Sequence, residues 1–247
     1  VGILNLDGAL TNTTNLSVTG ATALGADVTT SGAQTYTGLV TADVAAKRTL
    51  TGSTITLTGG LDGGAQALDI AGDLVTGAAM TNITVLDVSG TASLGGSVTT
   101  ADSLTIDGTL TLTTNITLDS TGNDATDDIT LAAISGTPDG ATESLVLDAG
   151  AAGAISVSGA VTGLEDLSLT LSDGATFAAV TLNNDFTITG ATTGANITFN
   201  GNLSLGGDFI TAASNYNIAI NEDITVVDQV TFANTGLLVL GDGTDDN

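Results

Sequence analysis

The sequence predicts an all-β chain wound into a parallel β-helix, also called a β-solenoid. Two observations favour this fold class: short runs in which apolar residues alternate with Thr or Ser, and a spacing of six residues between many successive runs. Alternation with a period of two is typical of a strand with one buried side, whereas a helix repeats its apolar residues three and four positions apart. Three-residue strands would make very short hairpins, so we expect the chain to bend at each corner and continue onto the next face of a coil.

The strand unit is an apolar residue, a Thr or Ser, and a second apolar residue. We expect the apolar pair to point into the core and the hydroxyl residue to point outward, because successive side chains of a strand alternate between its two sides. In chain order, the clearest units are residues 55–57, 104–106, 110–112, 116–118, 129–131, 186–188, 197–199 and 203–205.

The spacing of the units predicts the size of a coil. Runs begin at residues 104, 110 and 116, at 180 and 186, at 197 and 203, and at 218, 224 and 230, which are steps of six. The corners between them, such as 107–109 and 200–202, are rich in Asp, Asn and Gly, which tolerate left-handed backbone angles and bond their own backbone. Three faces of this kind make a coil of about 18 to 20 residues, and coils stack into a repeat architecture.

A longer internal repeat supports the same architecture. Aligning the chain with itself at an offset of 70 places Leu16 on Leu86, Val18 on Val88, and the run 28–30 on the run 98–100. Four coils of about 17.5 residues, or three of about 23, would return both copies to the same face. We therefore expect residues 1–247 to form one continuous solenoid of about 12 to 14 coils and about 60 Å. The chain opens without Met or a signal-peptide pattern, which suggests a processed chain or a fragment of a longer repetitive protein.

The rhythm lapses in two places. We expect loops or irregular coils to protrude between Gly136 and Ala152 and between Ala42 and Thr49. The second break contains Lys47 and Arg48, which we interpret as solvated charges on a surface loop, with a ligand anchor as the alternative.

Composition and charge exclude many functions. The chain has 27 acidic residues against two basic ones, a formal net charge of −25, and no His or Cys. Imidazole catalysis, thiol nucleophiles, Cys/His zinc sites, haem ligation by His and disulfides all need residues that are absent. Nucleic acid and anionic membrane surfaces would be repelled by this charge. Thr, Asn and Gly interrupt the apolar stretches, so we expect no span of a membrane.

We also expect no enzymatic activity. Adjacent carboxylates, such as those of Asp127 and Asp128 or of Glu165 and Asp166, would point to opposite sides of a strand. The two carboxylates of a glycosidase must instead flank one bond.

Carboxylate clusters leave one candidate site. The densest acidic run supplies oxygen ligands suited to Ca²⁺, which takes six to eight of them, and a second run at residues 242–247 is similar. Neither run matches the EF-hand loop or the Gly-rich calcium nonapeptide, so a solvated polar corner is the alternative interpretation. No other cofactor is expected. The candidate calcium ligands are Asp119, Asn123, Asp124, Asp127 and Asp128.

Several segments resemble a known family. Leu16-x-Val18-x-Gly20, the runs 97–100 and 201–207, and the Thr-Leu-Thr strings are similar to repeats of filamentous-haemagglutinin-like adhesins and autotransporter passengers. The resemblance implies a right-handed parallel β-helix within a long, secreted bacterial surface protein that binds hosts, surfaces or sister cells. It brings no catalytic residues. From the residues alone, a left-handed hexapeptide helix with the same 18-residue coil stays open. The near absence of Lys and Arg makes this chain more acidic than is typical of the family. In this respect its composition is more similar to that of surface-layer proteins or of proteins secreted at high salt.

These observations predict an extracellular structural and adhesive module that works as a stiff, repetitive stalk. The alternative is a self-assembling surface-layer or filament subunit, stabilised by calcium. In either case we expect the open strand edges at the ends to pair with further repeats or with neighbouring copies, end to end. A remote alternative is an ice-binding solenoid, because the runs 54–58 and 109–113 place Thr outward at every second position. Such pairs do not recur at a constant coil spacing, so we interpret these Thr residues as ordinary strand formers.

Overall fold

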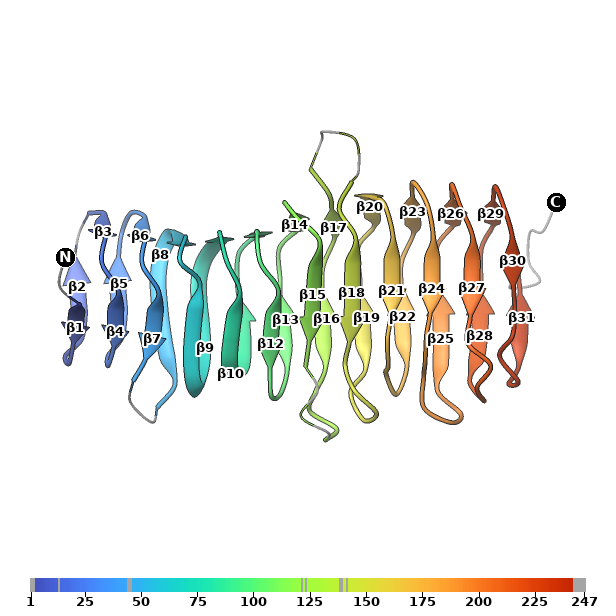
Figure 1. The fold of residues 1–247 in the computed structure, drawn as a ribbon, viewed down its shortest axis with the longest axis horizontal. Coiled ribbons are helices and arrows are strands. Elements are labelled where there is room, and N and C mark those ends of the chain that lie inside the picture. The colour runs from blue at the N-terminus through green and yellow to red at the C-terminus, as the bar shows by residue number, and fades with distance from the viewer. Residues whose placement is uncertain are drawn as a thin grey trace.

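The computed structural model describes residues 3–12, 14–43, 46–120, 122, 124–137, 140 and 142–241, which form a β-solenoid of about 11 turns (Figure 1). Strands β1 to β31 pair in parallel from coil to coil, and the described residues contain no α-helix. Accordingly, nothing in the described ranges forms a helix long and apolar enough to cross a membrane. The predicted fold class is confirmed.

The strands stack on three faces, which we call A, B and C. Face A contains β1 (Leu4–Leu6), β4 (Thr22–Leu24), β7 (Val40–Ala42), β12 (Val98–Thr100), β15 (Ile116–Asp119), β18 (Leu145–Asp148), β21 (Leu167–Leu169), β24 (Phe186–Ile188), β27 (Phe209–Thr211) and β30 (Val230–Thr231). Face B contains β2 (Leu10–Asn12), β5 (Val28–Thr30), β13 (Leu104–Ile106), β16 (Ile129–Leu131), β19 (Ile155–Val157), β22 (Ala175–Phe177), β25 (Asn196–Phe199), β28 (Asn217–Ile220) and β31 (Leu238–Leu240).

Face C contains β3 (Leu16–Val18), β6 (Gln34–Tyr36), β11 (Ala92–Leu94), β14 (Leu110–Leu112), β17 (Ile134–Ser135), β20 (Val161–Leu164), β23 (Val180–Leu182), β26 (Leu203–Leu205) and β29 (Ile224–Val226). Three longer strands bend through corners and serve more than one face: β8 (Arg48–Leu57), β9 (Leu61–Thr76) and β10 (Met80–Val88).

Coil length varies along the chain. A regular coil advances the chain by 18, since Leu4 lies opposite Thr22 and Thr22 opposite Val40 (22 − 4 and 40 − 22). In the middle of the chain Ile116 lies opposite Leu145, which is 29 residues further on. The predicted length of a coil is thus confirmed for the regular coils. The structure has about 11 turns, slightly fewer than the expected 12 to 14 coils, because the long coils use chain without adding turns.

The core is a narrow aliphatic column, as the alternating pattern predicts. In all eight apolar–hydroxyl–apolar units both apolar residues are buried. Aromatic residues fill part of the column in its C-terminal half, where Phe177 and Phe199 of consecutive coils stack at 5.4 Å between ring centroids. Ladder pairing of this kind repeats the same residue types from coil to coil and keeps the core continuous.

Glycines stack at the corner between faces B and C. A Cβ added to Gly90 would lie 2.5 Å from the carbonyl oxygen of Gly72, and one added to Gly108 would lie 2.5 Å from that of Gly90. The N–H of Gly108 donates a hydrogen bond of 3.0 Å to the same Gly90 oxygen. Consecutive coils therefore touch through their backbones at this corner, where a side chain would not fit.

The long internal repeat does not return to the same face. Leu16 lies on face C, in a ladder that continues through Gln34, Ile55, Leu74 and Ala92. Leu86 lies on face B, opposite Leu104. Leu16 and Ala92 are four coils apart and differ by 76 in residue number (92 − 16), so an offset of 70 falls one strand-and-corner step short. The prediction that both copies share a face is wrong for this reason.

Both predicted breaks contain loops. The break between Gly136 and Ala152 contains the loop between β17 and β18, together with β18 itself, and the break between Ala42 and Thr49 contains the connection between β7 and β8. Chain also protrudes between β15 and β16, where the sequence predicts no break, at the edge of the view in Figure 1 opposite to the loop between β17 and β18. At the second break, between Ala42 and Thr49, Lys47 is exposed and pairs with Asp69 at 2.6 Å. Arg48, however, is buried at an inward position of β8, opposite Leu68, and its Nε donates to the Leu24 carbonyl oxygen at 3.3 Å. The expectation of a solvated Arg48 is wrong, because backbone carbonyls of the solenoid take up its N–H groups.

Candidate cation site

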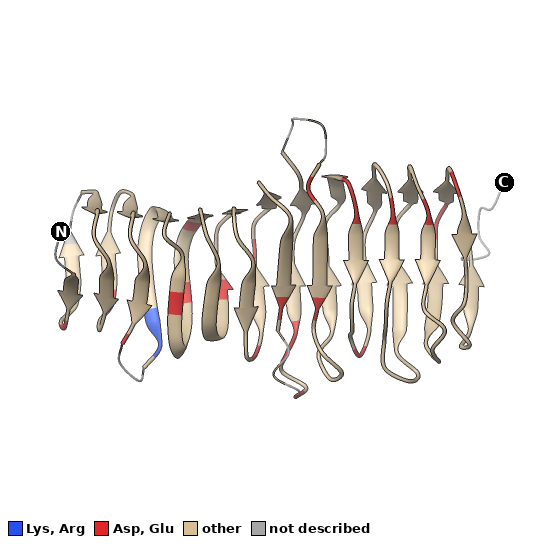
Figure 2. Cartoon of the chain, viewed as in Figure 1, with Lys and Arg blue, Asp and Glu red and all other residues tan. Residues whose placement is uncertain are grey.

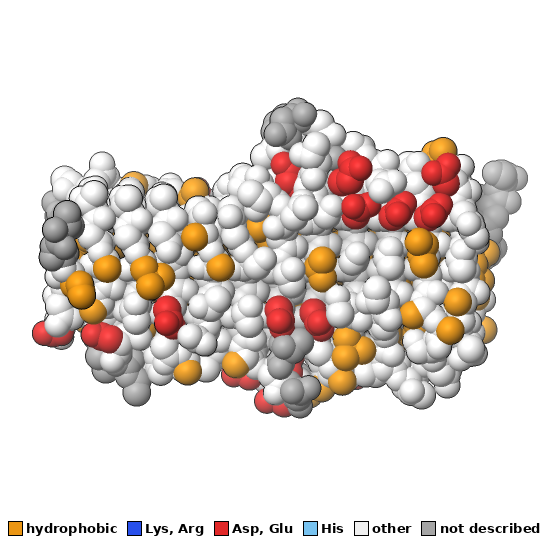
Figure 3. Space-filling view, in the orientation of Figure 1, with side chains coloured by type: hydrophobic (Ala, Val, Ile, Leu, Met, Phe, Trp, Pro, Cys, Tyr) orange, Lys and Arg blue, Asp and Glu red, His pale blue; other side chains and the backbone are white. Residues whose placement is uncertain are grey.

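Acidic residues are spread along the solenoid, whereas Lys and Arg are confined to one place near the start of β8 (Figure 2). In the C-terminal half, carboxylates gather along one corner (Figure 3). Residues at the corner between faces C and A there include Asp166, Asp185 and Asp208, each of which precedes a face A strand.

These three carboxylates bond the coils together. Asp166 Oδ1 accepts the backbone N–H of Asp185 at 3.2 Å, and Asp185 Oδ1 accepts that of Asp208 at 2.7 Å. Asp208 Oδ1 accepts the N–H of Gln229 at 2.8 Å. Each side chain therefore satisfies an amide of the next coil that the strand ladder leaves open.

The same arrangement recurs at other corners. A side-chain oxygen of one coil accepts a backbone N–H of the next coil in the pairs Asn15 with Ala33, Asp27 with Thr49, Asp73 with Thr91, Asn115 with Ser144, Asp128 with Ala154, and Asn217 with Leu237. Most corner Asp and Asn residues named so far thus have a structural role in coil stacking.

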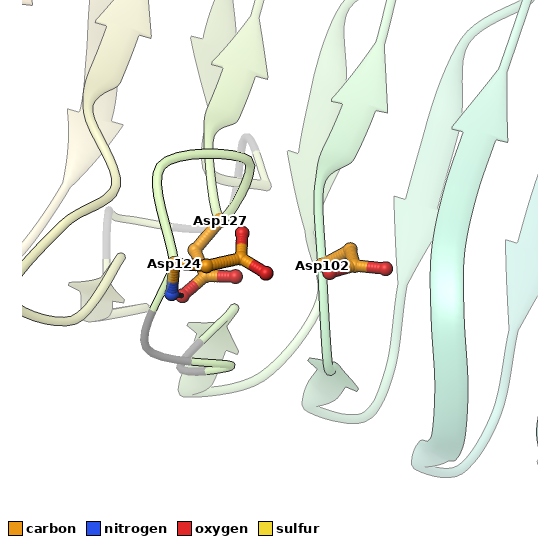
Figure 4. Close-up of side chains that lie close together, drawn as sticks. All are labelled: Asp102, Asp124 and Asp127. Carbon is orange, nitrogen blue, oxygen red and sulfur yellow. Dashed lines mark hydrogen bonds between the residues drawn. The ribbon is translucent and has the colours of Figure 1, made fainter.

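A different arrangement joins Asp102, Asp124 and Asp127 (Figure 4). Asp102 lies between β12 and β13, and the other two lie between β15 and β16, at the same corner one coil later. One carboxylate oxygen from each residue lies within 4.8 Å of the others. Asp127 is fully buried, Asp102 is half-buried and Asp124 is exposed.

Local hydrogen bonds shape this acidic loop. Asp127 Oδ2 accepts the backbone N–H of Asp124 at 2.8 Å, and the Ser120 hydroxyl donates to the Asp127 carbonyl oxygen. The hydroxyl and the N–H of Thr126 both donate to Asp124, and these bonds lower the pKa of that carboxyl below its ordinary value. Asp124 is therefore negatively charged at neutral pH.

The second oxygen of Asp127 is the unusual feature. Asp127 Oδ1 is buried and has no hydrogen-bond partner among the described residues. A Cβ on Gly122 would lie 2.6 Å from this oxygen, so glycine at that position leaves it room. A buried carboxylate oxygen without a partner is costly, and native structures usually give such an atom a proton donor or a cation.

The structure brings together part of the set of residues predicted from the sequence. Asp124 and Asp127 lie in one cluster, and Asp102 joins them. Asp128 is half-buried and its Oδ1 accepts the N–H of Ala154, whereas Asp119 is part of β15, opposite Thr99. Asn123 and the run 242–247 lie outside the described residues.

Only the coil register could have identified Asp102. Leu104 pairs with Ile129, so residues two positions before each strand, Asp102 and Asp127, are equivalent in consecutive coils. The inserted residues of the loop obscure this equivalence in the sequence, because they separate the two positions by more than a regular coil.

Paired outward Thr residues do not form a continuous array. Thr54 lies opposite Asp73 in the next coil, and Thr113 donates to a backbone carbonyl, that of Leu94, at 3.1 Å. On face C, the outward position on either side of a strand's central residue is therefore Thr in some coils and another residue in others. The irregular spacing of the Thr pairs in the sequence predicts this.

Comparisons with protein-family models, with curated proteins and with solved structures find no match to this chain. The resemblance to adhesin repeats thus rests on the quoted motifs and on the β-solenoid itself.

Proposed function

We propose that the chain is a structural and adhesive module of a bacterial surface protein, acting outside the cell as a stiff, repetitive stalk. The observation that carries this proposal is the continuity of three parallel ladders and one core through about 11 turns. Each coil is bonded to the next along every face, so bending would break many backbone hydrogen bonds at once. A scaffold of this kind suits a function that depends on length and repetition.

The absence of His and Cys supports a role without catalysis, since the common nucleophile and base pairs need them. The adhesive role and the location outside the cell rest on the resemblance of the repeats to adhesins. The negative charge agrees with a partner that is neither nucleic acid nor an anionic membrane.

Attachment of cells that display the chain tests this proposal. We expect bacteria displaying it to attach to host cells, abiotic surfaces or sister cells more than bacteria displaying an unrelated folded domain of matched charge. Removing residues 80–97, one whole coil because Met80 lies opposite Val98, should leave attachment unchanged, since a repetitive stalk does not depend on one coil. Equal attachment by the two kinds of cell to all three surfaces would contradict the adhesive role.

A second candidate function, a self-assembling filament subunit, is favoured by exposed apolar residues of the last described coil. Ile224, Val226, Val230, Phe232 and Leu240 line a hollow of about 320 Å³ at the last described coil. Leu237 and Leu240 are 63% and 54% exposed there. We propose that the first coil of a second copy covers this end, because its strands β1, β2 and β3 offer parallel edges of the same three-faced shape.

Electron microscopy of the purified chain tests this second role. We expect end-to-end filaments from the unaltered chain and single rods from Leu240→Asp, which adds a charge to the apolar end. Thr176→Asp adds the same charge on an exposed outward position of face B and should leave the filaments intact. Single rods from the unaltered chain would rule out self-assembly without affecting the role as a stalk.

A further inference from the structure

We propose that Asp102, Asp124 and Asp127 bind one Ca²⁺ ion, which joins two consecutive coils at the corner between faces A and B (Figure 4). This role goes beyond that of a stalk, because it makes the stability of the middle coils depend on a ligand. Asp102 comes from the coil of β12 and β13, and the other two carboxylates come from the coil of β15 and β16.

The spacing of the oxygens fits one ion. Calcium binds oxygen at about 2.3 to 2.6 Å, so two ligands on opposite sides of the ion lie about 4.6 to 5.2 Å apart. The three carboxylate oxygens lie within 4.8 Å of one another and can reach the same ion. The hydroxyl of Thr126 lies between two of them, 3.4 Å from Asp102 Oδ1 and bonded to Asp124 Oδ1, and offers a further oxygen.

The buried oxygen of Asp127 is an independent indication of a ligand. Asp127 is completely buried, one of its oxygens is bonded to the N–H of Asp124, and the other has no partner among the described residues. A proton on the free oxygen would in turn need an acceptor. A cation held between Asp127 and Asp102 satisfies this oxygen directly and compensates its charge.

The chain itself supplies no positive charge to this corner. Its two basic residues are Lys47, which pairs with Asp69, and Arg48, which bonds the carbonyl oxygens of Leu24 and Lys47. Three carboxylates in close contact would repel one another, and a divalent ion removes that repulsion.

The donor set favours Ca²⁺ over Mg²⁺ and Na⁺. All three groups are hard carboxylate oxygens, and they come from a loop and a neighbouring corner rather than from a compact octahedral frame. Mg²⁺ demands near-ideal octahedral geometry at about 2.1 Å and usually keeps several waters, with only one or two carboxylates. Na⁺ carries half the charge and compensates the cluster less.

Calorimetric titration and thermal unfolding of the full chain, each started from chelator-treated protein, test this proposal. We expect CaCl₂ to bind with one high-affinity site per chain and to raise Tm by roughly 5 °C at saturating concentration. NaCl at matched ionic strength should give a smaller increase by screening alone, and MgCl₂ should bind at least tenfold more weakly than CaCl₂.

Variants of the cluster separate the site from the general effect of charge. Asp127→Asn keeps the shape of the side chain and should abolish the increase in Tm that is specific to calcium. Asp102→Asn, at a half-buried position, should weaken calcium binding at least tenfold. Asp128→Asn is the matched control, because it removes a neighbouring charge while its amide oxygen can still accept the N–H of Ala154. It should bind calcium as the unaltered chain does.

Three results would overturn the proposal. The first is equal Tm values in calcium and in sodium at matched ionic strength. The second is full calcium binding by both Asp102→Asn and Asp127→Asn. The third is a loss of calcium binding in Asp128→Asn as large as that in Asp127→Asn. If Asp127→Asn does not fold, Asp102→Asn alone decides, because its side chain lies nearer the surface.

Discussion

Asp119 lies directly opposite Asp148 in the parallel ladder between β15 and β18, so two carboxylates occupy equivalent outward positions in consecutive coils. Burial raises the pKa of Asp148 above its ordinary value, and the charge of Asp119 raises it further, while the N–H of Gly150 opposes the shift. Asp69 and Asp87 form a similar pair one face away. Burial again raises the pKa of Asp87, followed by the charges of Asp69 and Asp107. Stacking of consecutive coils thus brings negative charges together in a chain that has only two basic residues.

These pairs predict that mild acid stabilises the protein. The pKa of Asp87 and of Asp148 is higher in the folded chain than in the unfolded chain, so the folded chain binds more protons between the two values. The free energy of unfolding then rises as the pH falls through the folded pKa toward the ordinary value of 3.8. The pKa of Asp124 is lowered in the folded chain, so protonation of this residue decreases the free energy of unfolding, but only at a lower pH. We expect Tm, measured in chelator at fixed ionic strength, to be higher at pH 5 than at pH 7, and a lower Tm at pH 5 would refute this expectation.

Removal of one charge from the Asp119 and Asp148 pair should stabilise the chain. Asp148→Asn keeps an oxygen that can accept the N–H of Gly150 and removes the repulsion across the ladder. We expect the free energy of unfolding at pH 7 to rise by a few tenths to about 1 kcal/mol, and the difference to vanish below the ordinary carboxyl pKa. Asp228→Asn at an exposed corner is the control and should change stability less. Chemical denaturation at both pH values measures the effect, and destabilisation by Asp148→Asn at pH 7 would count against it.

The carboxylates at the corner between faces C and A should act as hydrogen-bond acceptors rather than as charges. Asp185→Ala leaves the N–H of Asp208 without its acceptor, at a cost of about 1 to 3 kcal/mol. Asp185→Asn retains an oxygen acceptor and should unfold close to the unaltered chain. Denaturant titration of the two variants gives the comparison. Equal losses of stability in both would mean that the negative charge, and not the hydrogen bond, holds the coils together.

The glycine column predicts a strong dependence on position. Gly90→Ala places a Cβ 2.5 Å from the carbonyl oxygen of Gly72, so the two coils must separate locally, at a cost of about 1 to 3 kcal/mol. Gly8→Ala meets no atom within 4 Å and serves as the control. We expect thermal unfolding to separate the two variants clearly. A Gly90→Ala variant as stable as Gly8→Ala would mean that the coils stack less closely than in this structure.

Most of the fold could be predicted from local pattern. Units such as 104–106 and 110–112 predict both the position of a strand and which of its side chains are buried, because burial in a strand has a period of two. The register between distant coils could not be predicted in the same way. It depends on how much chain each corner holds, and insertions such as the one between Asp119 and Ile129 change that amount without altering the strand pattern.

The candidate site was only partly predictable for the same reason. Asp124 and Asp127 are close in sequence and were expected to act together, whereas Asp102 becomes their neighbour only through the pairing of Leu104 with Ile129. The lapse of the six-residue rhythm between Ala42 and Thr49 predicts a loop for Arg48, yet this residue belongs to β8, where the carbonyl oxygens of Leu24 and Lys47 accept its N–H groups.

Deletion in and out of coil register tests the central claim, a continuous solenoid of stacked coils, most directly. Removing residues 80–97 joins Ala79 to Val98, the ladder partner of Met80, so every later coil keeps its register. Removing only 80–88 takes out an odd number of residues and turns inward positions outward. We expect circular dichroism, melting and small-angle scattering to give a folded rod for the first deletion, shorter by about 4.8 Å, and loss of cooperative unfolding for the second. Two equally stable deletion variants, or two unfolded ones, would contradict the stacked solenoid.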